Sequence, residues 1–140
     1  MDSGGLNPGR SRPMPLSVLS ASLGADVALN NTANYFDGPS VATGAAGTWD
    51  VSATITLQDT AGAATFHVKL WDGTTVIASC TLQSVGINST LCAALSGVIA
   101  APAGNLRMSA KDVTSVSGKI LFSQSGNAKD STITARRIRA

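Results

Sequence analysis

The stretch from Trp49 to Leu57 alternates apolar and polar residues without a break, and it constrains the fold more than any other part of the chain. Apolar side chains occupy every second position, and Asp, Ser or Thr fills each position between them. A β-strand repeats every two residues, so this pattern places one face on a core and the other toward solvent. A helix would spread the same apolar residues around its whole surface. The stretch therefore predicts a half-buried strand with Trp49 in the core.

The residues that follow predict a hairpin and then further short strands. Residues 66–71 alternate again, Asp72-Gly73 follows, and residues 76–82 form the second strand. Asp-Gly between two such stretches is a strong hairpin signal, because Gly accepts the positive φ of a tight turn. More strands are predicted over 27–31, 34–41, 90–100, 106–110, 119–123 and 132–138. No amphipathic helix separates them, which predicts antiparallel sheets.

Composition agrees with an all-β fold and excludes several other classes. The chain is 44% hydrophobic, 4% aromatic and 13% charged, and its eight acidic residues are all Asp. This excludes a charged disordered tail and a heptad coiled coil. We expect residues 25–140 to form one antiparallel β-sandwich. Because Ala and Gly are abundant, its core should be thin, and oligomer contacts should add stability.

The first 24 residues have a different character. They contain three of the five prolines within a Gly-rich stretch, which prevents a helix or a central strand. We expect an extended N-terminal docking arm over residues 1–24, which packs on the chain's own body or on a partner. The residues expected to carry its binding are Arg10, Arg12, Pro13, Pro15, Leu16, Val18 and Leu19.

Basic residues gather at the two ends of the chain. Half of the ten lie at the termini, and the C-terminal ones are Arg136, Arg137 and Arg139. Basic ends on a neutral body can hold an acidic partner surface, or they can serve solubility. We do not expect nucleic acid as the partner, because the net charge is only +2 and no aromatic residues interleave with the arginines.

No segment predicts a membrane span or a signal peptide. The longest apolar run is shorter than the roughly 18 residues that a membrane helix requires. The stretch after Arg12 begins with prolines and is broken by three serines. We expect no signal peptide and synthesis in the cytoplasm.

Three stretches carry a resemblance to a known group of proteins. They are residues 47–57, the hairpin over 66–79, and the closing strand over 131–138. Their order resembles small jelly-roll domains of tailed-phage and prophage virion proteins, such as head-decoration, head-fibre and tail-fibre modules. That architecture is similar to the tumour-necrosis-factor and complement globular-head family. The resemblance implies a jelly-roll β-sandwich that builds a homotrimer or another symmetric assembly, with an arm that anchors it to a larger shell.

Few residues offer chemistry, and we expect no enzyme. His67 is the only histidine, and the alternation places it beside Trp71 on an outward face. A general base needs a partner and a pocket, so we expect His67 at a surface or an interface. Trp71 fits a protein interface, a platform for a sugar ring, or a position covered by a loop.

Metal and cofactor sites are not predicted. No calcium loop, phosphate loop or zinc spacing is present. The Asp residues flank turns, where Asp accepts backbone hydrogen bonds. Cys80 and Cys92 are expected as small buried apolar residues, although a disulfide between neighbouring strands stays open.

The resulting hypothesis is a phage virion structural protein that decorates or extends a capsid or tail. It would associate with itself, with a trimer favoured, and bind a capsid, portal or tail protein through its arm. The alternative is a receptor-binding or glycan-binding tail-fibre module. A small hydrolase on the same architecture would need a catalytic constellation that the sequence does not contain.

Overall fold

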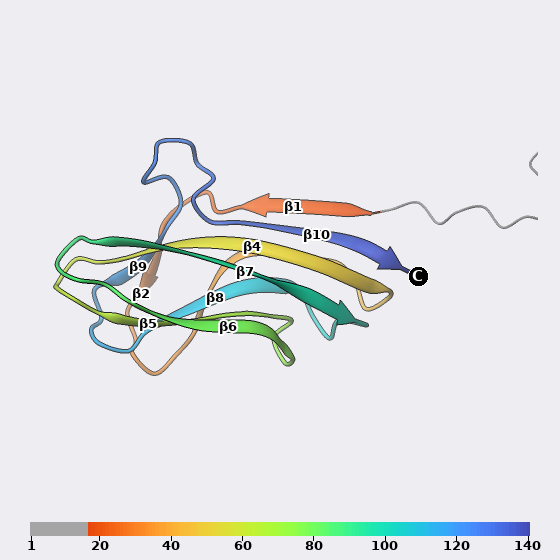
Figure 1. Cartoon of the computed structure of the whole chain (residues 1–140), viewed down its shortest axis with the longest axis horizontal. Coiled ribbons are helices and arrows are strands. Elements are labelled where there is room, and N and C mark those ends of the chain that lie inside the picture. Colours follow the sequence, from red (N-terminus) through yellow and green to blue (C-terminus); the bar gives the residue numbers. More distant parts are fainter. Residues whose placement is uncertain (1–16) are drawn as a thin grey trace, which may run out of the picture.

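The computed structural model describes residues 17–140, which fold into two antiparallel β-sheets packed face to face (Figure 1). The described residues form no helix, so they contain no helical segment that could span a membrane. The strands are β1 (Val18–Ser22), β2 (Val27–Leu29), β3 (Phe36–Val41), β4 (Thr48–Asp59), β5 (Thr65–Trp71), β6 (Val76–Gln83), β7 (Thr90–Ala100), β8 (Leu106–Asp112), β9 (Gly118–Leu121) and β10 (Thr132–Arg139). The predicted antiparallel sandwich is confirmed.

The larger sheet, sheet A, is built around β4. Strand β7 pairs along the whole of one edge of β4, from Thr48 opposite Ala100 to Gln58 opposite Thr90. Along the other edge, β10 pairs with the first half of β4 and β9 pairs with the second half. Strand β1 then pairs with β10, and β2 pairs with β9.

Two pairs of strands in sheet A behave as long strands with an interruption. Strands β9 and β10 run in the same direction along one edge of β4, and the loop over 122–131 projects between them (Figure 1). Strands β1 and β2 are interrupted opposite that loop. Hydrogen bonds join the two interruptions, from the Leu23 N–H to the Ser131 carbonyl (3.1 Å) and from the Phe122 N–H to Asp26 Oδ1 (3.0 Å).

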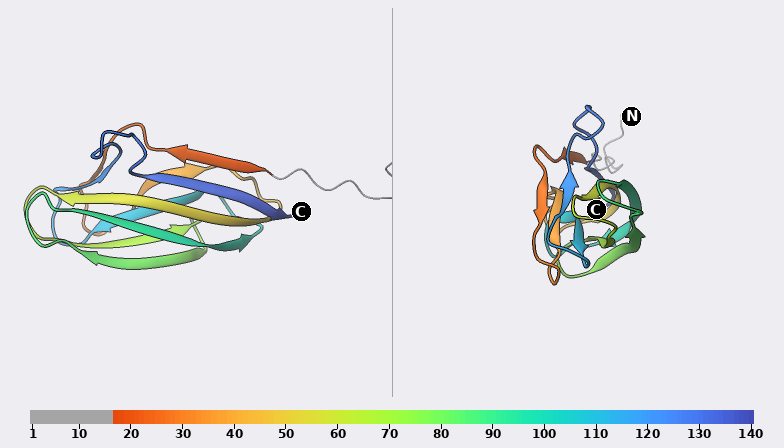
Figure 2. Two further views of the ribbon diagram at one scale, coloured as in Figure 1. Left: turned by 45° about the horizontal axis from the view of Figure 1, so that its top comes forward. Right: turned by 90° about the vertical axis from the view of Figure 1, so that its left-hand side faces the viewer.

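The smaller sheet, sheet B, has the order β3-β8-β5-β6. Figure 2 shows the two sheets from the side and from one end. The hairpin of β5 and β6 forms at the predicted Asp72-Gly73 turn, where Gly73 has a φ of 92°. The register shifts between Leu70 and Trp71. Val76 is therefore 48% exposed, whereas the rest of its predicted apolar face, Ala78, Cys80 and Leu82, packs against the core.

The core lies between the two inner faces, as the alternation predicts. Trp49, Val51, Ile55 and Leu57 of β4 are at most 2% exposed. They face Phe66, Val68 and Leu70 of β5 and Leu106 and Met108 of β8, all fully buried. Removing each of these side chains from water contributes about 1.5–3 kcal/mol, so the inner faces hold the sheets together.

The segment predicted as the docking arm packs on the chain's own body in its second half, which is one of the two expected alternatives. Residues 18–22 of the predicted arm are strand β1 of sheet A, because their backbone pairs with β10 from Val18 opposite Arg136 to Ser22 opposite Thr132. Leu19 packs against the core, and Val18 is 60% exposed. The other residues predicted for the arm, Arg10, Arg12, Pro13, Pro15 and Leu16, lie outside the described residues.

Candidate interaction surfaces

The outer face of sheet A carries small side chains over four neighbouring strands. Two rows of residues cross β1, β10, β4 and β7 in register. We call this surface the small-residue face, with Ser20, Thr134, Ser52 and Ser96 in one row and Ser22, Thr132, Thr54 and Ala94 in the other. Across the β1–β10 boundary the hydroxyl of Ser20 is hydrogen-bonded to that of Thr134 (3.1 Å), and Ser22 is hydrogen-bonded to Thr132. The face holds no charged group.

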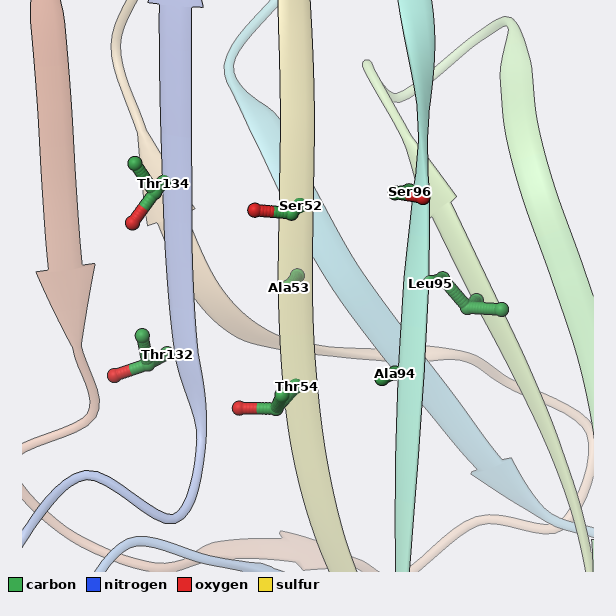
Figure 3. A pocket seen from close by; sticks show the side chains of 8 residues that line it. All are labelled: Ser52, Ala53, Thr54, Ala94, Leu95, Ser96, Thr132 and Thr134. Atoms are coloured by element: carbon green, nitrogen blue, oxygen red, sulfur yellow. The ribbon is translucent and has the colours of Figure 1, made fainter.

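Two shallow hollows lie along this face. The first, of about 290 Å³, is lined by Ser52, Ala53, Thr54, Ala94, Leu95, Ser96, Thr132 and Thr134 (Figure 3). The second, of about 400 Å³, lies at the edge of the face between β4, β7 and the projecting loop over 122–131, where Lys129 and Asp130 line it, and Thr54 lines both. Hydroxyl and aliphatic groups line the first hollow, and none of its lining side chains is charged. It therefore offers surface for packing and hydrogen bonding, but no group that titrates near neutral pH.

One end of the small-residue face carries charge and apolar side chains. The next row is Val18, Arg136, Asp50 and Val98. The Arg136 guanidinium forms an ion pair with Asp50 at 3.1 Å, and Val98 is 57% exposed. The predicted interface residue Arg136 is thus ion-paired within its own chain.

The other two arginines lie at the same end of the sandwich. The Arg137 N–H donates to the Ser17 carbonyl at 2.9 Å, so the first described residue lies beside the last strand. The side chain of Arg139 is exposed. The described chain therefore begins and ends at one pole, which concentrates the C-terminal arginines next to the point where residues 1–16 join the body.

The outer face of sheet B has the opposite chemistry, because large aromatic and cationic side chains gather on it. Lys69 Nζ lies 3.6 Å from the centroid of the Trp71 ring and 4.0 Å from that of Tyr35. Arg107 lies over Trp71 (5.9 Å) and Lys111 over Tyr35 (4.8 Å). Cations at these distances are attracted by the aromatic ring. We call this surface the aromatic–cation face, with members Tyr35, His67, Lys69, Trp71, Arg107 and Lys111.

A hydrogen-bond network fixes the indole of Trp71. Its Nε1–H donates to Ser109 Oγ at 2.8 Å, and the buried Ser109 hydroxyl donates to Asp37 Oδ1 at 2.8 Å. The second oxygen of Asp37 accepts a hydrogen bond from Arg107 at 3.2 Å. Trp71 is half-buried, as its outward phase predicts, and Lys69 lies against one face of the ring, where a sugar would stack.

His67 lies in the middle of sheet B without an acidic neighbour. It pairs in register with Thr81 on β6 and with Lys111 on β8. Within residues 17–140 no hydrogen bond joins its ring to a carboxylate or a nucleophile. Triad chemistry requires such a relay, and the described residues form no such relay at His67.

Three Asp residues act at turns, as predicted. Asp59, Asp72 and Asp112 each accept a hydrogen bond from the backbone N–H two residues later. Burial opposes ionisation of Asp72, but the N–H groups of Ala103, Thr75 and Thr74 hold the pKa of its carboxyl below the usual value. In the described chain no three His, Cys, Asp or Glu side chains gather as a metal site would require.

The cysteines differ from the expectation of two buried residues. Both are free thiols. Cys80 is half-buried on β6, and burial raises the pKa of its thiol. Cys92 is exposed, because it alternates with Leu91 and Ala93 and so faces outward beside Thr56. A buried Cys92 was therefore a wrong prediction.

The sequence did not predict the two surfaces as units. The alternation places Lys69 and Trp71 on one face, but Tyr35 and Lys111 reach them only through the register of β3, β8 and β5. The small-residue face likewise needs four strands from distant parts of the chain. The available signal was the repeated Ser or Thr at outward positions of residues 52–56 and 132–134.

Comparison with known proteins identifies the architecture. No protein-family profile and no curated protein matches the chain. The solved structure of Eiger TNF from S. frugiperda is similar, at 11% identity and a TM-score of 0.51, over 89% of this chain and 93% of that one. This chain is a jelly-roll β-sandwich.

Weaker similarities extend to two further structures. The C-terminal CBM6 of the laminarinase LamC from Zobellia galactanivorans has 14% identity to this chain and a TM-score of 0.41, over 89% of this chain and 92% of the CBM6. VP2 in the subviral particle of infectious bursal disease virus has 13% identity to this chain and a TM-score of 0.39, over 99% of this chain and 37% of VP2.

Proposed function

We propose that this jelly roll is a structural component of a phage virion, a decoration or fibre subunit that works by binding. It associates symmetrically with copies of itself, as a trimer in the favoured arrangement. Its N-terminal segment attaches the assembly to a capsid, portal or tail protein. The protein is made in the host cytoplasm and ends in the virion.

The observation that carries the proposal is the small-residue face. Short hydroxyl and methyl side chains lose little rotational entropy when they are covered, and an uncharged face has no ion to desolvate. Faces of this kind allow two sheets to approach at the usual distance of about 10 Å. Most homo-oligomers are closed and symmetric, so a face that fits its own copy builds a defined assembly.

The placement of the termini supports the attachment step. Ser17 and the C-terminal arginines share one pole, where Arg137 is joined to Ser17. The segment that contains Arg10 and Arg12 therefore enters the body beside Arg136, Arg137 and Arg139. The C-terminal arginines at this pole favour an acidic surface on the partner protein.

The self-association is tested by the mass of the full chain in solution. We expect light scattering after size exclusion to give an oligomer, and Ser52→Arg to reduce it to a monomer, because the guanidinium would be buried in the contact. The matched control is Thr81→Arg, an exposed outward position on sheet B. A monomeric wild type, or an oligomer that tolerates Arg at 52, would exclude this interface.

The virion assignment needs a separate measurement. Particles from the producing host are separated on a density gradient, and each fraction is analysed by peptide mass spectrometry. A polypeptide that follows the particles in many copies is a virion structural protein. One that stays with the free protein is not, and a ligand-binding module then becomes the leading hypothesis.

A further inference from the structure

The aromatic–cation face of sheet B has an unbalanced charge. Lys69, Arg107 and Lys111 lie on it with His67, and Asp37 is the acidic group that reaches it. Asp37 is already occupied by Arg107 and by the Ser109 hydroxyl. Within residues 17–140, Lys69 and Lys111 have no carboxylate partner, and aromatic rings are their contacts instead.

The strand register brings like charges together. Lys69 and Lys111 are diagonal neighbours on β5 and β8, because Lys111 stands opposite His67 and Lys69 is two residues further along β5. Cations in adjacent positions of a sheet destabilise it unless something compensates them. Two rings compensate in part through cation–π attraction. A bound anion would compensate the rest, so the face is arranged in advance for an acidic ligand.

The side chains of this face are also held in place. The Trp71–Ser109–Asp37–Arg107 network fixes the indole and the guanidinium, and Ser109 is fully buried beneath them. Tyr35 and Trp71 then limit the positions that Lys69 can adopt. A surface whose side chains are ordered before binding loses less entropy when a partner arrives.

We propose that the aromatic–cation face binds a carboxylate-rich surface of a partner protein. Trp, Tyr and Arg are the residues enriched where protein interfaces hold most of their binding energy, and all three lie here together. A nucleic acid would need a track of cations along its phosphates, whereas these cations form one compact group. A stacking sugar would compete with Lys69 for the face of Trp71.

This inference goes beyond the proposed function, since it assigns a second surface and a different class of partner. Self-association uses the outer face of sheet A, and this contact uses the outer face of sheet B. Each can fail without the other. Measuring the oligomer mass and the ligand affinity on the same sample of full chain therefore tests them separately.

The test uses a fluorescein-labelled peptide of eight Asp-Ser repeats as the acidic probe and the Asn-Ser repeat as its neutral counterpart. Binding is followed by anisotropy, and Trp71 reports locally, because the chain has two tryptophans and Trp49 is only 2% exposed. We expect the acidic peptide to bind, to shift Trp71 emission, and to dissociate as salt rises.

Matched variants locate the contact. Lys69→Gln combined with Lys111→Gln should weaken binding roughly tenfold, while Lys119→Gln combined with Lys129→Gln, which removes the same charge elsewhere, should change it less than about twofold. If the double variant does not fold, Lys111→Gln alone is tested, and we expect it to lose less affinity for the acidic peptide than the double variant. Thermal unfolding of each variant checks the fold.

Three results would overturn the proposal. They are no binding of the acidic peptide, an equal loss in both pairs of variants, and binding of a heparin hexasaccharide in place of the peptide. The last result would assign the face to an acidic glycan.

Discussion

The carboxyl groups of Asp59 and Asp112 lie close enough to interact in the interior of the sandwich, where β4 and β8 end. The two residues are at most 1% exposed. Asp112 Oδ1 accepts the N–H groups of Thr114 and Ser115, while its Oδ2 is buried and receives no hydrogen bond from a donor in the described chain. Two carboxylates in this position cannot both ionise without cost, so the pair keeps a proton below about pH 6.

The first prediction is a loss of stability as pH rises through about 6. Burial and the neighbouring Asp59 carboxyl raise the pKa of Asp112 from 3.8 to about 6. Between those values the folded state keeps a proton that the unfolded chain releases, so the free energy of unfolding falls as pH rises. Burial acts to raise the pKa of Asp59, but its interactions with Asp112 and Ser115 outweigh burial and lower the pKa below 3.8. The stability that the ionised Asp59 carboxylate contributes is therefore lost below about pH 4. The pair is therefore most stabilising near pH 4, and its contribution declines from there to about pH 6.

Asp112→Asn tests this prediction directly. The amide keeps the acceptor for Thr114 and Ser115 and donates to Asp59 without needing a proton. Urea unfolding should show the variant more stable than wild type at pH 7.5 by about 2–3 kcal/mol, as expected for a pKa that moves from 3.8 to about 6. The difference should shrink at pH 4.5. Asp112→Ala, which leaves two N–H groups unpaired, should be less stable at both pH values. Parallel pH curves for wild type and Asp112→Asn would contradict the shared proton.

The second prediction concerns the glycine that packs on this pair. A Cβ at Gly118 would overlap Asp112 Oδ2 and lie 2.9 Å from Asp112 Cβ. Gly118→Ala should therefore lower the free energy of unfolding by about 1–3 kcal/mol, because the buried carboxyl has to move. Gly24→Ala is the control, since nothing lies within 4 Å of its added Cβ. Equal stabilities of the two variants would mean that Asp112 can move freely.

Local pattern was sufficient for most strands. The alternation over Trp49–Leu57 predicted the inner face of β4, and the expected strand over 90–100 has the observed bounds of β7. Strand β1 was missed because a short segment next to prolines carries no alternation strong enough to mark it. Its partner, β10, lies more than a hundred residues away. Pairing over such a distance depends on packing, which local periodicity does not contain.

The candidate surfaces were harder to predict for the same reason. The alternation over β5 correctly predicted that His67 and Trp71 face outward. It could not predict Tyr35, which reaches this face from the segment before β3. Cys92 shows the opposite error. Its phase between Leu91 and Ala93 predicts exposure, and the general tendency of cysteine to be buried was given more weight than that phase.

The third prediction separates β1 from the segment that precedes it. Deleting residues 1–16 should leave the stability of the body unchanged and abolish attachment to particles. Deleting residues 1–24 should also destabilise the body, because it uncovers the edge of β10 and the core contact of Leu19. Thermal unfolding and co-sedimentation with particles measure the two effects. Normal attachment of the shorter deletion would exclude the arm as the anchor, and equal melting of both deletions would exclude β1 as a stabilising strand.

The fourth prediction uses the exposed thiol of Cys92 as a reporter of the small-residue face. Cys92 lies outward on β7 beside Thr56, next to the hollow shared with the projecting loop, whereas Cys80 is half-buried and burial raises the pKa of its thiol. A maleimide should therefore label Cys92 first in the monomer, because the thiolate is the reactive form. If sheet A forms the self-association interface, labelling of Cys92 should slow as protein concentration rises, while Ser52→Arg keeps the fast rate. Cys92→Ser confirms which thiol reacts, and a labelling rate independent of concentration in an oligomeric sample would place the interface elsewhere.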